Sequence, residues 1–131
     1  MWPIVFLCPF AKAVQSHQVA EREFQINGLI TCSTTGCVYK ILCGKCLDFV
    51  YYGETGRALR TRFAEHIRDI RKARAKPVAE HFNMPGHDLD DVVFIGIEKV
   101  MPPGDTFLRK QRESYYIRRG NAVHVGGNRR F

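Results

Sequence analysis

The sequence predicts a small α+β domain in which a three-stranded antiparallel sheet is flanked by helices. Two observations carry this prediction. Short runs rich in β-branched and aromatic residues occur as a closely spaced pair and then once more nearer the C-terminus, whereas other segments repeat their apolar residues at helical spacing. Two hairpin strands followed later by a third, with helices in between, are typical of an antiparallel sheet with helices packed on it.

The strands are expected at four places. Residues 24–31 are mildly strand-like. Residues 37–42 and 49–52 are short β-rich runs joined by C-G-K-C-L-D, which indicates a hairpin, and Gly53 is expected to end the second run. Residues 91–100 alternate between apolar and polar side chains, as a strand with one buried face does.

Three helices are expected, over residues 57 to about 74, 77–82 and 106–119, before a Gly-rich tail over 120–131. The first has an apolar stripe that should face the core. This stripe consists of Leu59, Phe63, Ile67 and Ile70. The second helix should begin at Pro77, because proline is favoured at the first helical position.

The length and charge of the chain limit what it can be. Its 131 residues suffice for one domain with its own core. We expect a poorly specified leader over residues 1–23 and the domain over residues 24–131. With 20 basic against 13 acidic side chains the formal net charge is +7, which favours polyanionic partners such as nucleic acid. The apolar run at the start falls short of the roughly 20 residues that a membrane span needs.

The first helix and the residues just before it are strongly basic. Basic side chains of this kind bind flanking phosphates of DNA without reading its sequence. The residues expected to do so are Arg57, Arg60, Arg68, Arg71 and Lys72.

Five further residues have side chains suited to phosphodiester cleavage. Tyr39 and Tyr51 could project from one small sheet, although tyrosines in strands also simply pack. Arg62 and His66 are one helical turn apart, so an arginine that can grip phosphate lies beside a histidine that can pass a proton. A solvated basic face with a chance histidine is the alternative. Glu113 is either a surface charge or a ligand for a hard cation such as Mg²⁺.

In this order and at these spacings the residues resemble the GIY-YIG nuclease family. C-V-Y at 37–39 and Y-Y-G at 51–53 stand where the two name-giving motifs would be, and R-F-A-E-H at 62–66 matches the Arg-x3-His helix motif. Glu113 matches the metal-binding glutamate of the family, and Asn128 in G-G-N-R-R looks like its late asparagine.

The resemblance extends over residues 31–131 and has two departures. Cys37 replaces the first glycine of the first motif, a position that shapes the backbone rather than supplying chemistry. The usual proline before the late asparagine is also missing.

The resemblance implies a metal-dependent DNA endonuclease that nicks DNA by hydrolysis. Glu113 would hold one Mg²⁺ or Mn²⁺ ion on the scissile phosphate. Tyr39, helped by His66, would take a proton from the attacking water, and Tyr51 would position that water or a phosphate oxygen. Arg62 would stabilise the charged transition state. The expected partner is DNA, with no membrane and no small-molecule substrate, and the oligomeric state stays open.

Four further residues suggest a zinc site. Cys43 and Cys46 lie between the two tyrosine motifs, and His81 and His87 follow on the short helix and its turn. Two cysteines and two histidines suit tetrahedral Zn²⁺. The arrangement resembles the zinc-bearing GIY-YIG endonucleases attached to Penelope-like retroelements, in which a cysteine pair interrupts the hairpin and a histidine pair follows the motif helix.

The alternative to zinc is a set of free cysteines and surface histidines. The number of cysteines, five, is odd, and no convincing secretion signal precedes them, so we expect an intracellular protein. With DNA as its partner, we expect it in the nucleus. Cys32 could replace one zinc ligand, whereas Cys8 and Cys37 are expected to be plain thiols.

Two other functions remain open from the sequence. A zinc-stabilised module could bind DNA without cutting it. A basic domain could also dock on an anionic membrane, which fits the charge but leaves the Tyr, Arg-His and Glu set unexplained.

Overall fold

The computed structural model describes residues 16–19, 22–25, 30–46, 49–120 and 128, with the backbone alone in the first two ranges. Its elements are β1 (Ser16–Val19), β2 (Arg22–Gln25), β3 (Thr35–Cys43), β4 (Val50–Ala58), α1 (Leu59–Arg71), α2 (Pro77–Phe82), a 3-10 turn η1 (Leu89–Asp91), β5 (Val92–Lys99) and α3 (Thr106–Arg119). The expected leader over 1–23 contains β1 and the start of β2, while Cys8 and nearly all of the tail lie outside the described residues.

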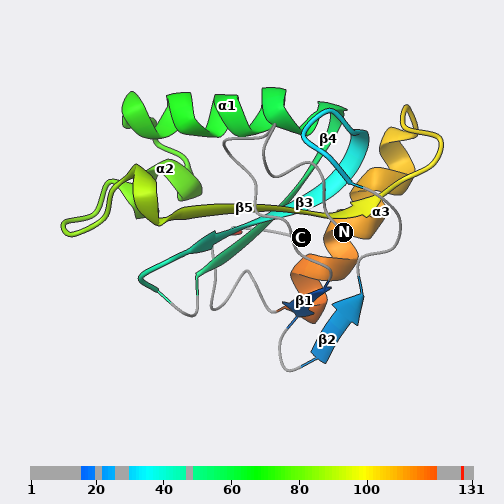
Figure 1. Ribbon diagram of the computed structural model, residues 1–131, viewed down its shortest axis with the longest axis horizontal. Helices are drawn as coiled ribbons and strands as arrows, with labels where there is room; N and C mark the ends of the chain where they lie inside the picture. Colours follow the sequence, from blue (N-terminus) through cyan, green and yellow to red (C-terminus); the bar gives the residue numbers. More distant parts are fainter. Residues whose placement is uncertain (1–15, 20–21, 26–29, 47–48, 121–127, 129–131) are drawn as a thin grey trace.

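Three strands form an antiparallel sheet in the order β4-β3-β5, which confirms the predicted α+β class (Figure 1). β3 is the central strand, and Tyr39 in its middle lies opposite Gly53 of β4 and Gly96 of β5. β1 and β2 pair with each other in a separate two-stranded sheet. β4 is therefore an edge strand of the main sheet.

Helices cover both faces of this sheet. Successive side chains of a strand point to opposite faces. Tyr51 of β4 packs against His66 of α1, and the next residue, Tyr52, stacks on Tyr116 of α3 with ring centroids 5.8 Å apart. α1 therefore lies against one face with α2 beside it, and α3 lies against the other (Figure 1). None of the helices in the described part of the chain combines the length and apolar character that a bilayer crossing requires.

The apolar stripe of α1 enters the core largely as the sequence predicts. Leu59, Phe63 and Ile70 are buried, and Phe63 stacks on Phe94 of β5 with ring centroids 4.4 Å apart. Ile67 is only partly buried, and His66 occupies the core-facing position beside it. The helix is rotated slightly from the predicted orientation, so that an imidazole rather than an aliphatic side chain faces the sheet.

The prediction that Gly53 ends the second strand is wrong, because β4 continues through it to Ala58. A Cβ atom at Gly53 would lie 2.4 Å from the hydroxyl of Tyr39. The glycine is needed to make room for a ring on the neighbouring strand. As a consequence α1 begins at Leu59, and Arg57 belongs to β4 rather than to the helix.

Cys37 stands where the resemblance calls for a glycine, and Gly36, just before it, provides the irregular backbone instead. Gly36 has a φ of 69°, in the left-handed region that favours glycine, and the β3–β4 register shifts between Thr35 and Cys37. Cys37 itself is fully buried within the strand. The backbone irregularity is thus supplied at Gly36, and a side chain at Cys37 packs into the core.

Candidate functional site

Tyr39, His66 and Arg62 form one hydrogen-bonded group between the sheet and α1. The Tyr39 hydroxyl lies 2.7 Å from His66 Nε2, and Arg62 Nε donates to the same hydroxyl at 3.1 Å. The ring of Tyr39 packs edge-on against Phe63, with centroids 5.4 Å apart. Arg62 and His66 reach the phenol together because they are one turn apart on α1.

Tyr51 borders this group on the same face of the sheet. Its ring centroid lies 5.7 Å from that of His66, and the Arg62 guanidinium is near enough to its phenol to oppose the rise in pKa that burial causes. Tyr39 is 0% exposed, whereas Tyr51 is only half-buried. Arg62 thus lies near two phenols, of which Tyr51 is the one that meets solvent.

Burial keeps the central group uncharged apart from Arg62. Burial, and then the charge of Arg62, lowers the pKa of His66 to about 3. Burial also raises the pKa of Tyr39 and of Tyr51, although Arg62 acts in the opposite direction on both. A neutral phenol therefore faces a neutral imidazole at neutral pH, and the two can share one proton along their hydrogen bond.

Glu113 approaches the two tyrosines from α3. The backbone of Glu54 on β4 is near enough to its carboxyl group to oppose the rise in its pKa. Burial, and then the charge of Glu54, raises the pKa of Glu113 to about 7. Its charge in turn raises the pKa of Tyr39 and Tyr51, so it lies within electrostatic reach of both. A single carboxylate is a sufficient protein anchor for Mg²⁺, which keeps several of its waters.

Asn128 binds the outer edge of β4 through its side chain. Its Oδ1 accepts from the Tyr52 amide at 2.8 Å and its Nδ2 donates to the Tyr52 carbonyl at 2.9 Å. The carboxyl group of Glu113 lies near the backbone of Glu54, the next residue whose backbone faces outward along the same edge. The structure thus places the expected catalytic asparagine where it positions the strand that carries Tyr51.

Two of the expected DNA-binding residues have partners within the chain. Arg57 forms two hydrogen bonds with Glu65, at 2.6 and 2.8 Å, and Arg60 donates to Ser33 Oγ at 2.6 Å. Both arginines are exposed, so a phosphate can compete for them. Glu65 also binds Arg62, at 3.0 Å, and so links the basic surface to the tyrosine group.

The other three, Arg68, Arg71 and Lys72, are exposed on α1 or at its end. The helical period directs Arg68 and Lys72 outward, away from the sheet. Arg71, like Arg60, leaves the helix on the flank opposite Arg62. A DNA strand lying over Arg62 would therefore meet Arg68 and Lys72 first.

The four expected zinc ligands lie together. Cys43 ends β3 and Cys46 follows it, His81 belongs to α2, and His87 follows that helix. Their ligand atoms all lie within 4.8 Å of one another, and Cys46 Sγ is 3.2 Å from His87 Nε2. This group can hold a metal ion, and its two sulfur and two nitrogen donors are compatible with structural zinc. Cys32 is not a member of the group.

Contacts around this group orient its donors. The Lys45 amide donates to Cys43 Sγ at 3.4 Å. The Lys45 side chain reaches the Gly86 carbonyl and lies 3.2 Å from Asp91. The ring of Phe49 stacks on that of His81, with centroids 3.8 Å apart. Outer contacts of this kind fix the orientation of metal ligands.

Two acidic residues that the sequence did not predict, Glu65 and Glu54, organise this site. Glu65 is three residues from Arg62, a spacing that could have identified it. Glu54 binds Arg109 Nε at 2.8 Å and Lys110 Nζ at 3.2 Å, and both partners are more than 50 residues away along the chain. No local pattern predicts such a contact. Arg109 is buried and also donates to the Pro103 carbonyl, so it attaches α3 to β4 one turn before Glu113.

Comparisons with known proteins identify no relative. No family model matches the chain, and neither a curated protein nor a solved structure matches it. The function must therefore be argued from the residues themselves.

Proposed function

We propose that this protein is a metal-dependent DNA endonuclease that hydrolyses phosphodiester bonds and nicks its substrate. The observation that carries the proposal is the convergence of Tyr39 from β3, Tyr51 from β4, and Arg62 and His66 from α1, with Glu113 of α3 in electrostatic reach. These residues are separate in sequence and have the side chains that phosphoryl transfer requires. The proposed substrate implies a nuclear location.

Arg62 would bind the scissile phosphate and stabilise the transition state. Without DNA, its guanidinium is held by Tyr39 and Glu65. A phosphate group is a strong competitor for both contacts, because it accepts two hydrogen bonds from a guanidinium. As Arg62 turns to the phosphate, a lone pair of the Tyr39 oxygen becomes available to water.

Proton transfer would then run along the Tyr39–His66 hydrogen bond. As the water oxygen bonds to phosphorus, its proton passes to the Tyr39 oxygen and the Tyr39 proton passes to His66 Nε2. The bond from phosphorus to the leaving oxygen breaks. Tyr51 would orient the water or a phosphate oxygen from the solvent side. A divalent ion held by Glu113 would polarise the phosphate and stabilise the leaving oxygen.

Nicking of supercoiled plasmid with and without Mg²⁺ or Mn²⁺ tests the proposal. We expect conversion to open circles only with a metal. Arg62→Ala should abolish cutting while it changes DNA affinity by no more than a few-fold, because Arg62 acts mainly in the transition state. Cutting at the wild-type rate by the variant would remove Arg62 from the mechanism.

A DNA-binding module that does not cut is the second candidate. Arg68 and Lys72 together with the Cys-His group support binding without chemistry. Strong DNA binding with no metal-dependent nicking on any substrate would favour it.

A further inference from the structure

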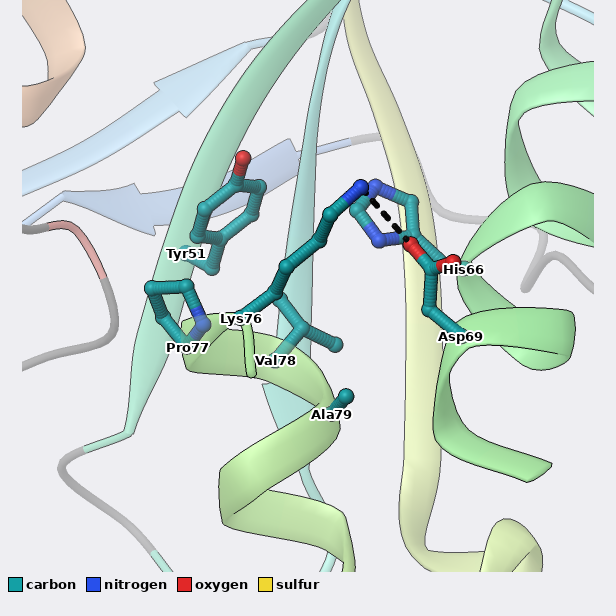
Figure 2. A pocket seen from close by; sticks show the side chains of 7 residues that line it. All are labelled: Tyr51, His66, Asp69, Lys76, Pro77, Val78 and Ala79. Atoms are coloured by element: carbon teal, nitrogen blue, oxygen red, sulfur yellow. Dashed lines mark ion pairs between the residues drawn. The ribbon is translucent and has the colours of Figure 1, made fainter. Parts of the chain in front are cut away.

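A pocket lies beside the tyrosine group, between β4, α1 and α2 (Figure 2). It is bordered by Tyr51, His66, Asp69, Lys76 and Pro77, and the first turn of α2 forms its floor. It encloses about 80 Å³. Because Tyr51 and His66 also belong to the proposed catalytic group, whatever occupies this pocket lies next to the bond that is cut.

The walls of the pocket differ in chemistry. Figure 2 shows the rings of Tyr51 and Pro77 on one side, and Asp69 with His66 on the other. The two rings offer flat apolar surface on which an aromatic ligand can stack. The Lys76 side chain extends between the two sides to Asp69. A ligand here would thus meet a flat apolar surface and, next to it, a carboxylate acceptor and an ammonium donor.

The mouth of the pocket carries more positive than negative charge. Asp69 is paired with two cations, Arg74 Nε at 3.3 Å and Lys76 Nζ at 3.4 Å. The side chains of Arg74 and Lys76 are 50% and 61% exposed. Such exposed ion pairs contribute little to stability, so an incoming phosphate can take over one of the cations at small cost.

We propose that this pocket is a subsite for one nucleotide adjoining the scissile phosphate. The base lies against Tyr51 and Pro77, and its phosphate is held by Lys76 with Arg74. The inference rests on the proposed nuclease function and specifies its substrate. The enclosed volume, about 80 Å³, is well below the roughly 300–1,000 Å³ of sites that enclose a whole ligand. The pocket can take only the edge of one base that lies against the two rings, with the rest of the nucleotide at its mouth, and it cannot take a base pair, so the base must be outside the double helix.

This geometry makes a specific demand on the substrate. A base that must leave its stack does so at least cost where it is already unpaired. The enzyme should therefore cut faster when the nucleotide at this position is unpaired. Such a base can come from a bulge within a duplex or from a single-stranded flap.

The experiment compares the full chain on matched oligonucleotides, after the position of the nick has been mapped on a paired duplex. A bulged nucleotide, a flap nucleotide or an abasic residue in the same backbone is moved one position at a time across the nick. We expect one position at which an unpaired nucleotide speeds nicking, and at which loss of the base slows it by about tenfold, the scale of base stacking. Bulge and flap substrates distinguish the two sources of the base.

Pro77→Ala and Lys76→Ala should each reduce the difference in nicking rate between the substrate with the unpaired base and the abasic substrate. Alanine suits the first turn of a helix, and Lys76 is exposed, so both chains should fold, which their melting temperatures report. Lys99→Ala, at an exposed lysine of β5, is the matched control and should keep the full effect.

Three outcomes would overturn the subsite. If base and abasic substrates are cut equally at every position, the subsite is wrong and the nuclease function stands. If the base effect persists in both pocket variants, the base is recognised elsewhere. If no substrate is cut with any metal, the proposed function fails and the subsite fails with it.

Discussion

The side-chain amide of Asn128 forms two hydrogen bonds with the backbone of Tyr52, donating one at 2.9 Å and accepting the other at 2.8 Å. Tyr52 lies on the outer edge of β4, where no strand of the described part of the chain pairs with its amide and carbonyl. Asn128 supplies both missing partners and is itself buried. Because Tyr51 and Gly53 flank this residue, the contact fixes the strand segment that holds Tyr51 in the site and makes room for Tyr39.

Asn128→Ala should weaken the fold more than the chemistry. Two buried backbone groups would lose their partners, which costs about 1–3 kcal/mol in the free energy of unfolding. Urea unfolding measures this loss, and nicking should persist at a reduced rate below the unfolding midpoint. Asn128→Asp restores only the acceptor and should be intermediate in stability. Complete loss of nicking at unchanged stability would instead place Asn128 in the chemistry.

Glu113→Gln should abolish nicking and should not destabilise the protein. The pKa of Glu113 in the folded state, about 7, lies above its ordinary value of 4.5, so the folded state binds this proton more tightly than the unfolded state. Stability from this group is present at low pH and is lost as pH rises from about 4.5 to 7. Glutamine at this position removes that loss. We therefore expect the free energy of unfolding at pH 8 to rise by about 1 kcal/mol, after allowance for the partial exposure of the side chain.

Urea unfolding at pH 5 and pH 8 tests this expectation, and Asp90→Asn, at an exposed carboxyl, is the matched control.

The pKa of Glu113 also governs activity, because only the ionised carboxyl binds a metal. At low metal concentration the nicking rate should rise with pH up to about 7. No separate step near 6.5 is expected from His66, whose pKa is about 3. A gain in stability confined to acid pH would contradict the account of Glu113.

Tyr39→Phe should lower nicking by at least about 100-fold, the scale of a proton-transfer contribution. The change deletes the hydroxyl that joins His66 to Arg62 and preserves the ring that packs on Phe63. DNA affinity should stay within a few-fold of wild type. Tyr115→Phe, on the partly buried tyrosine of α3, removes a phenol outside the site and should cut normally. Near-normal cutting by Tyr39→Phe would exclude the proposed proton path.

DNA binding should depend steeply on salt and little on sequence. Arg68 and Lys72 project outward from α1, so each should neutralise a phosphate. Changing both to alanine should reduce the steepness of the slope of log affinity against log salt concentration by about 2. Arg60→Ala should change the slope less, because Arg60 lies on the opposite flank and binds Ser33. If Arg60→Ala and Arg68→Ala changed the salt slope equally, the DNA would have to cover both flanks of the helix.

Local signals predicted the three helices and the three strands of the main sheet, but not β1. The strand expected over residues 24–31 is wrong in its bounds, because β2 ends at Gln25 and residues 30 and 31 lie outside any strand. Long-range contacts were not accessible to the sequence. α2 and α3 begin and end where expected, because Pro77 occupies the first helical position and Asp105 caps the other helix by accepting from the Leu108 amide. Gly53 was misinterpreted because its role depends on a ring of the neighbouring strand. The four Cys-His ligands were found by type and spacing, whereas the attachment of Glu54 to Arg109 depends on a contact between distant segments.

Zinc removal should unfold the domain and thereby disable it. The Cys-His group joins the end of β3 to α2 and the turn after it, and α2 also forms the floor of the pocket beside Tyr51. Structural zinc supplies on the order of 10 kcal/mol in isolated peptides, so its loss should matter to a domain of this size. We expect the purified protein to contain about one zinc per chain. Strong chelation should lower the melting temperature sharply, and Mg²⁺ alone should not restore nicking.

Cys43→Ser should reproduce chelation, because it removes one ligand from the group. Cys37→Ala is the matched control: it removes a buried thiol of the same strand that lies outside the group and should leave the zinc content unchanged. Elemental analysis and thermal unfolding of the two variants separate loss of metal from loss of core packing. A zinc-free protein that is folded, stable and active would remove zinc from this account, and the proposed endonuclease would then depend on the tyrosine group alone.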